Sequence, residues 1–147
     1  MPAKVPLYLE RAGEDPLLSE EGDAVGLEII GTETGRSFFF IPGCAAMTDG
    51  VRRRLAGSAL VFFDGTLWRD DEMIRLGVGS KTGRRMGHMS MSGEDGAIAA
   101  FRDLGVGRRI FIHINNSNPA LLEDSPERRI ANAAGWEIAY DGMEVML

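Results

Sequence analysis

Three side chains that suit a metal ion stand at the predicted ends of regular elements. Asp64 follows the apolar run ALVFF at residues 59–63, which predicts a buried strand that ends on a carboxylate. His88 precedes a predicted helix, and His113 lies near the carboxyl end of a second apolar strand. Because ligands gather at the carboxyl ends of strands in open α/β sheets, we expect these three groups to meet at one edge.

Imidazole nitrogen and carboxylate oxygen together suit zinc, iron or manganese, and a carboxylate can also bridge two cations. Each residue has a purely structural interpretation as well. Asp64 fits a plain turn, because aspartate favours turns. His113 fits a hydrogen-bonded core histidine, and His88 fits a helix cap or a surface residue. The residues alone leave both interpretations open.

Three asparagines follow His113 directly, at Asn115, Asn116 and Asn118. Their amides could bind carboxylates of a substrate or orient the metal ligands. The alternative is a turn and a helix cap ahead of Pro119.

The elements that must position these residues begin with two strands. Residues 26–31 and 36–43 predict an antiparallel hairpin, because the linker at residues 32–35 is short and turn-like. A helix is expected over residues 51–55, after a cap at Thr48 and Asp49.

Strands and helices alternate through the second half of the chain. Residues 77–87 are rich in glycine and basic residues and predict a loop. The expected elements beyond it are a helix within residues 94–106 that Gly105 ends, a strand over 108–116, a helix over 125–135 with Ser125 as its cap, and a hairpin over 136–147 that turns at Asp141 and Gly142. This alternation predicts an α/β fold in which part of the sheet is parallel.

Composition narrows the class of protein. The chain has 147 residues, 44% hydrophobic and 26% charged, which fits one soluble globular domain. A net charge of −6 argues against nucleic acid as the main partner, and the basic clusters at residues 52–54, 84–85 and 108–109 are expected to be solvated faces. Cys44 is the single cysteine, which excludes an internal disulfide and a multi-cysteine zinc site. No apolar run reaches membrane-helix length and no signal-peptide pattern is seen, so we expect no membrane association and a cytoplasmic location.

The stretch GHMSMSGEDGAIAAFRDLGVGRRIFIHIN, residues 87–115, resembles the late segment of the metallo-β-lactamase superfamily. Members have a histidine before a helix, then a strand that ends in a second histidine, and an aspartate at an earlier strand end that bridges the metal site. These positions match His88, His113 and Asp64. The resemblance implies the C-terminal half of an αβ/βα sandwich, with a mixed sheet and flanking helices.

Five stretches resemble the pyrroloquinoline quinone (PQQ) biosynthesis protein B family more closely, and they occur in the family's order. They are KVPLYLE, FFDGTLWRDDEM, GHMSMSG, IHINNSNP and SPERR. The resemblance implies a role in making PQQ, by iron-dependent hydroxylation of the tyrosine-derived precursor, with zinc as the alternative metal. Two other functions stay open, a PQQ carrier linked to transport and a metal-dependent hydrolase.

Members of that family are about twice as long as this chain. Their H-x-H-x-D-H-type loop and a cysteine-rich motif lie in the N-terminal half, and nothing here matches either. We therefore expect residues 1–147 to form one domain that corresponds to the C-terminal half, with an incomplete metal site and no activity alone. Asp64, His88 and His113 are the expected metal ligands, and His88 is also the expected catalytic residue.

The resemblance also implies a partner. The small-molecule PQQ precursor is expected to contact Asn115, Asn116 and Asn118. A homodimer is also expected. Arg84 and Arg85 are either contacts for this anionic precursor or plain surface charge.

Overall fold

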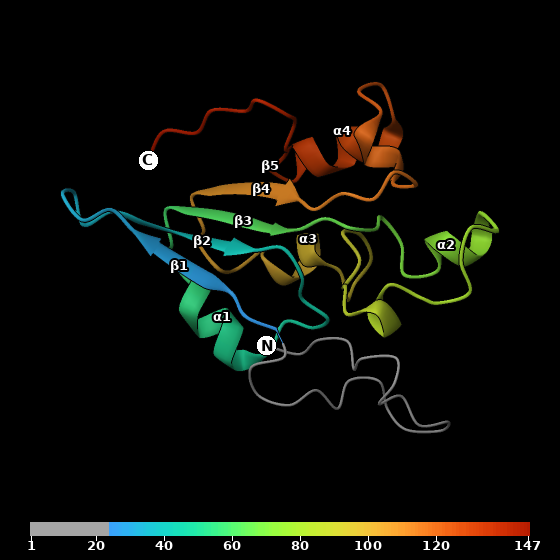
Figure 1. Cartoon of the computed structure of the whole chain (residues 1–147), viewed down its shortest axis with the longest axis horizontal. Helices are drawn as coiled ribbons and strands as arrows, with labels where there is room; N and C mark the ends of the chain where they lie inside the picture. Colours follow the sequence, from blue (N-terminus) through green and yellow to red (C-terminus); the bar gives the residue numbers. More distant parts are fainter. Residues whose placement is uncertain (1–23) are drawn as a thin grey trace.

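The structure, a computed structural model, describes residues 24–147. The stretch KVPLYLE at residues 4–10 lies outside the described residues, as does the first part of the predicted 1–147 domain. The described part forms a five-stranded sheet with helices packed against it (Figure 1). Among its helices, none combines the length and the apolar character that crossing a membrane requires.

The sheet is mixed, and its strands lie side by side in chain order. They are β1 (Leu27–Ile30), β2 (Ser37–Ile41), β3 (Leu60–Asp64), β4 (Arg108–Ile112) and β5 (Trp136–Ile138). β1 and β2 are antiparallel, which confirms the predicted hairpin. β2, β3, β4 and β5 are mutually parallel, so their carboxyl ends share one edge of the sheet.

Capping residues start two of the helices at the predicted places. α1 (Asp49–Leu55) begins where the Thr48 hydroxyl accepts a hydrogen bond from the backbone N–H of Val51, and α4 (Pro126–Ala133) begins where Ser125 caps Arg128. α3 (Ala97–Ala100) is shorter than expected. Two further elements were not predicted, α2 (Glu72–Arg75) and the 3-10 turn η2 (Arg84–Met86). The 3-10 turn η3 (Pro119–Leu121) begins at Asn118, whose side chain accepts from the N–H of Ala120, which confirms the alternative of an asparagine cap ahead of Pro119.

One strand boundary and one hairpin were predicted wrongly. β4 ends at Ile112 rather than at residue 116, because His113 has φ 55°, a left-handed conformation that does not continue a strand. The predicted hairpin after residue 136 is also wrong. The chain does turn at Gly142, where the N–H of Met143 donates to the carbonyl of Tyr140, but no described strand follows.

One face of the sheet carries the main core. Cross-strand register aligns Ile41, Phe63, Phe111 and Ile138 in one row across the four parallel strands, and all four are buried. Side chains of α1, α3 and α4 pack against this face, which closes the hydrophobic core.

The opposite face is less covered. Leu27 and Phe40 lie opposite each other on β1 and β2, and they are 51% and 37% exposed. Ile110 on the same face is fully buried. At the far edge Arg108 donates a hydrogen bond to Glu137 (Nη2 to Oε2, 2.8 Å), which holds the pKa of the Glu137 carboxyl below its usual value. Arg108 thus belongs to an ion pair rather than to a free basic cluster.

We predict that Trp136→Ala lowers the free energy of unfolding by about 3–5 kcal/mol, measured by urea denaturation. Trp136 is 2% exposed and stacks on Phe111 with 3.8 Å between ring centroids. Trp136→Phe should cost less, because it keeps a stacked ring and removes an indole N–H that has no partner in the described part of the chain. The exposed Tyr140→Ala is the control and should stay within about 0.5 kcal/mol of the parent. An equal loss in Trp136→Phe and Trp136→Ala would contradict the stacking argument.

Candidate metal centre

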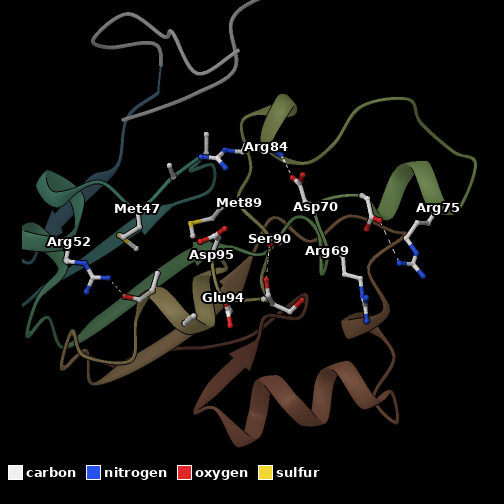
Figure 2. Close-up of a pocket in the computed structure, with 17 residues that line it drawn as sticks. Met47, Arg52, Arg69, Asp70, Arg75, Arg84, Met89, Ser90, Glu94 and Asp95 are labelled. Carbon is white, nitrogen blue, oxygen red and sulfur yellow. Dashed lines mark hydrogen bonds and ion pairs between the residues drawn. The ribbon is translucent and has the colours of Figure 1, made fainter. Parts of the chain in front are cut away.

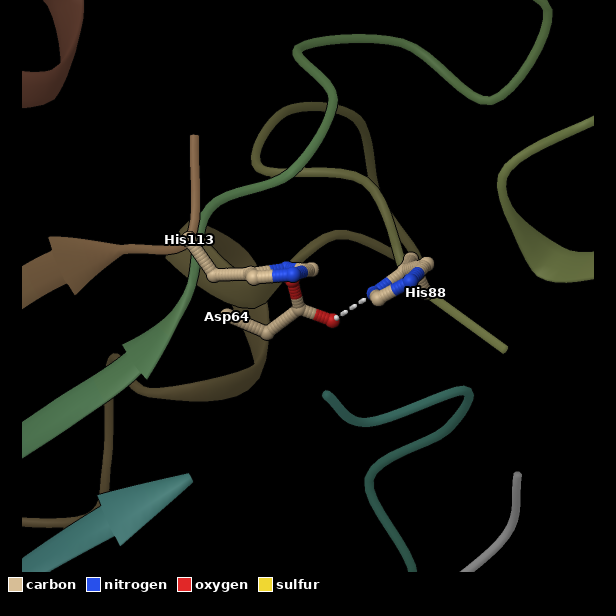
Figure 3. Close-up of side chains that lie close together, drawn as sticks. All are labelled: Asp64, His88 and His113. Carbon is tan, nitrogen blue, oxygen red and sulfur yellow. Dashed lines mark hydrogen bonds and ion pairs between the residues drawn. The ribbon is translucent and has the colours of Figure 1, made fainter. Parts of the chain in front are cut away.

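The three predicted ligands converge at the carboxyl edge of the parallel strands. Each of Asp64, His88 and His113 offers one ligand atom, and these atoms lie within 4.8 Å of one another. Figure 3 shows the two imidazoles on either side of the carboxylate. The predicted convergence is therefore confirmed, while ligation itself stays a prediction.

Each ligand comes from a different segment. Asp64 is the last residue of β3 and is fully buried. His88 follows Gly87, whose φ of 91° ends η2, and the next residue donates its N–H to the carbonyl of Cys44 at 2.7 Å. His113 follows β4 directly. Three separate loops thus meet above the sheet edge, and their backbones tie them together.

The Asp64 carboxylate is held by four hydrogen bonds. Its Oδ2 accepts from the backbone N–H of Cys44 at 2.9 Å and lies 2.9 Å from His88 Nδ1. Its Oδ1 accepts from the N–H of Thr66 at 3.1 Å and from the Thr66 hydroxyl at 2.6 Å. These contacts fix the orientation of a charge that would otherwise be costly to bury.

Thr66 is the site residue that the sequence analysis missed. Its hydroxyl lies 2.6 Å from Asp64 Oδ1, 2.8 Å from His113 Nδ1 and 3.1 Å from His88 Nδ1. The available signal was its position two residues beyond the strand-ending acid, in Asp64-Gly65-Thr66. Thr66 therefore connects all three candidate ligands.

The hydrogen-bond donors and acceptors around Thr66 show which nitrogen of each histidine carries a hydrogen. An ionised carboxylate only accepts, and a hydroxyl donates once and accepts twice. The Thr66 hydroxyl must then donate to Asp64 and accept from both imidazoles, so Nδ1 of His88 and of His113 carries a hydrogen. In a neutral ring the lone pair is then on Nε2. Within this network, Nε2 is the atom that each histidine can offer to a cation.

The donor set fits a borderline metal ion. One oxygen and two nitrogens are ligands that zinc and iron accept, and three protein ligands are what an open catalytic zinc site uses. A cation bonded to Asp64 would replace one of its present hydrogen bonds, because all four lone-pair positions of the carboxylate are taken. No fourth histidine, cysteine, aspartate or glutamate joins this group in the part of the chain that the structure describes.

Cys44 supports the site through its backbone only. Its thiol is fully buried and donates to the carbonyl of Ala46. Burial raises the pKa of the Cys44 thiol to about 11, so the thiol stays protonated at neutral pH. The thiol lies outside the group of candidate ligands, which leaves the N–H that bonds Asp64 as the contribution of Cys44.

The loops of Asp64 and His113 are joined by backbone contacts. The N–H of Gly65 donates to the carbonyl of Ile112 at 2.8 Å, and the N–H of Asn115 donates to the carbonyl of Thr66 at 3.0 Å. Residue 65 must be glycine for this approach, because a Cβ there would lie 2.8 Å from Cβ of Phe111.

The three asparagines have different surroundings. Asn118 is 2% exposed; its Nδ2 donates to the carbonyl of Gly65 and its Oδ1 accepts from the N–H of Ala120. Direct substrate contact by Asn118 stays a prediction that this geometry does not favour. Asn115 is half-buried and Asn116 is exposed, so both side chains have access to solvent. Their contacts with a substrate stay predictions.

A cavity of about 920 Å³ lies among segments that adjoin the site (Figure 2). Its walls include Ala45, next to Cys44, and Met89, next to His88. Its charged lining includes Arg52, Arg69, Arg84, Asp70, Glu94 and Asp95. The guanidinium groups of Arg69 and Arg84 have no partner in the described part of the chain. Arg84 and Arg85 were both considered as contacts for an anionic precursor. Of the two, Arg84 lines this cavity.

Comparison with known proteins agrees with this geometry. The family model described as the beta-lactamase superfamily domain matches residues 5–114. Coenzyme PQQ synthesis protein B of Gluconacetobacter diazotrophicus is 58% identical over 145 residues, which are 99% of this chain and 47% of the relative. The protein of the same name from Bradyrhizobium diazoefficiens is 53% identical over 147 residues, covering 100% and 48%. The chain thus spans about half the length of the curated relatives it matches, in their carboxyl-terminal half.

Solved structures give the same result. The crystal structure of zinc-bound PqqB from Methylobacterium extorquens matches with a TM-score of 0.90 and 49% identity, over 99% of this chain and 48% of that one. A diphosphatase of the PhnP family matches with a TM-score of 0.50 and 18% identity, over 84% and 42%, which shows a shared fold alone. The predicted resemblance and the predicted metallo-β-lactamase-like fold are both confirmed.

We predict that Asp64→Ala and His113→Ala each weaken zinc binding by about a hundredfold or more, which exceeds the loss typical of residues outside the ligand set. Titration against a chromophoric chelator measures the affinity. Asp103→Ala, an exposed acid outside the group, is the control. Unchanged zinc content in both ligand variants would refute ligation.

Cys44 gives a second prediction. Ellman's reagent should not react with the folded chain at pH 8 and should react fully in urea, because the thiol is buried and its pKa is raised to about 11. Reactivity should rise only as pH approaches that value, since the thiolate is the nucleophile. Cys44→Ala should keep zinc affinity within about twofold, because the N–H that bonds Asp64 remains. A large loss of affinity in Cys44→Ala would mean that the thiolate is a ligand.

Proposed function

The chain belongs to the beta-lactamase superfamily, and on this basis we propose that it acts in the synthesis of PQQ as the metal-binding portion of a PqqB-type protein. The observation that carries the proposal is the convergence of Asp64, His88 and His113 in a chain 58% identical to a coenzyme PQQ synthesis protein B. The identity supports the pathway, and the donor set supports a metal-dependent reaction.

The reaction we propose is hydroxylation of the tyrosine-derived ring of the precursor. One oxygen atom of dioxygen enters a C–H bond, and the other leaves as water with two electrons and two protons from a reductant such as ascorbate. A bound iron ion would supply the redox exchange with dioxygen that this reaction needs. Zinc, which the Methylobacterium extorquens structure contains, would suit hydrolysis instead, so the metal decides between the two chemistries.

The residues of this chain hold the metal and exchange protons. Asp64 and Nε2 of both histidines would bind the cation, and Thr66 orients all three. His88 is the candidate for proton transfer, because its Nδ1–H lies 2.9 Å from Asp64 and its side chain is 19% exposed. It therefore connects the buried carboxylate to the open side of the site.

Substrate binding is proposed for groups around this centre. The guanidinium of Arg84 lines the adjoining cavity and has no partner among residues 24–147, so it suits a carboxylate of the precursor. Asn116 is exposed on the loop that follows His113, so its amide can reach a bound molecule. Asn115 is half-buried and its Nδ2 donates to Ser117, which leaves its Oδ1 for a substrate.

The test uses this chain alone and the chain joined behind the part of Methylobacterium extorquens PqqB that it does not match. Each is loaded with iron or zinc and given a tyrosine-containing peptide, ascorbate and dioxygen. We expect iron-dependent oxygen uptake, with product that gains one oxygen atom, and a loss of about a hundredfold in Asp64→Ala. Arg84→Ala should raise KM more than it lowers kcat.

Other outcomes would overturn the proposal. Ester or phosphodiester hydrolysis with zinc and no oxygen uptake would indicate a hydrolase. Tight binding of PQQ without turnover, unchanged after metal removal, would indicate a carrier.

A further inference from the structure

Glu72 is a buried carboxylate outside the candidate metal centre. It is the first residue of α2 and is 6% exposed. Acidic side chains are seldom buried unless they are paired or hydrogen-bonded. Here both oxygens are used: Oε2 accepts from the backbone N–H of Trp68 at 2.7 Å, and Oε1 accepts from the Ser117 hydroxyl at 2.6 Å.

The two partners of Glu72 belong to the two loops that carry metal ligands. Trp68 lies four residues beyond Asp64 on the segment that leaves β3, and Ser117 lies four residues beyond His113 on the segment that leaves β4. The Glu72 carboxylate therefore joins both loops.

The bond to Ser117 continues toward His113. Asn115 Nδ2 donates to the Ser117 hydroxyl at 2.6 Å, so Ser117 accepts from Asn115 and donates to Glu72. Asn115 in turn donates its backbone N–H to the carbonyl of Thr66. Such an ordered chain ending on a charge is stronger than its separate neutral bonds.

His113 needs such support. Its φ of 55° is unfavourable for a residue with a side chain, and such conformations persist only where the surroundings hold them. Its imidazole is exposed, and it is oriented by the Thr66 hydroxyl and by stacking on His88, with ring centroids 5.2 Å apart, rather than by burial. Of the two partners of Glu72, Trp68 belongs to the hydrophobic core cluster and Ser117 does not, so the bond to Ser117 is the one that acts on the loop after His113.

We propose that Glu72 is a positioning residue, whose buried carboxylate holds the loop of residues 113–118 so that His113 faces Asp64 and Thr66. The expected effect of Glu72 on metal affinity rests on the proposed metal centre. Its effect on the orientation of His113 does not, because that orientation can be measured without metal.

The first test is imidazole nitrogen NMR of the metal-free 147-residue chain. The chain has only two histidines, and His113→Gln assigns the signals. We expect the parent to show both rings as Nδ1–H tautomers. Glu72→Ala should shift the His113 signals to those of a free imidazole. His88 should keep its Nδ1–H tautomer, because Asp64 holds His88 directly, and should respond only through its stacking on the His113 ring. Glu72→Gln should restore part of the His113 signal, since the Ser117 hydroxyl can turn to accept from the new amide.

The second test is cobalt binding by the same variants. Glu72→Ala and Ser117→Ala should weaken cobalt binding about ten- to a hundredfold and change the visible spectrum of the bound ion. Val51→Ala, a core change in α1, controls for lost stability, and Glu123→Ala controls for lost charge. Both controls should bind cobalt within about twofold of the parent.

The outcomes separate this inference from the proposed function. His113 signals that stay unchanged in Glu72→Ala would overturn the positioning role, whatever the metal data show. A parent chain that binds no cobalt, with the His113 signals still shifted by Glu72→Ala, would refute the metal centre and leave the positioning role supported. Loss of cobalt binding equal to that of Val51→Ala would mean that Glu72 is merely structural.

Discussion

The Asp64 carboxylate is the interaction on which the rest of the site depends. It lies at the last position of a fully buried strand, where an unpaired charge would be very costly. The Cys44 N–H, the Thr66 backbone and hydroxyl, and His88 all bond to it, and they come from the segments after β2, after β3 and after η2. Satisfying one charge therefore draws three loops to a single point.

The same bonds put metal binding and the protein's own hydrogen bonds in competition. The carboxylate accepts four bonds, and the Thr66 hydroxyl is fully used by Asp64 and both histidines. A cation can enter only where one of these contacts gives way, and His113 is the exposed member of the group. The site is thus organised before a metal arrives, which lowers the ordering cost of binding.

The sequence predicted most elements that continuous apolar runs or capping residues define. β3 and β4 read as buried strands, Thr48 and Ser125 start helices, and the strand-end rule brought Asp64 to both histidines. The failures were of another kind. The left-handed turn at His113 and the burial of Glu72 depend on contacts made only after folding, and no local pattern signals them. The position of Thr66 two residues beyond Asp64 was a local signal, but its bonds to both histidines depend on the fold.

Exposure changes in order across the three ligands, from buried Asp64 through half-buried His88 to exposed His113. A charge in a low-dielectric setting attracts a cation more strongly than one in water, so the acid supplies most of the attraction from below. The exposed imidazole then faces the side from which a substrate approaches. It has least packing to orient it and a strained backbone, so its precision must come from hydrogen bonds along the loop that follows it. For this reason Glu72, a buried acid eight residues beyond Asp64 in the chain, can affect a metal that it does not touch.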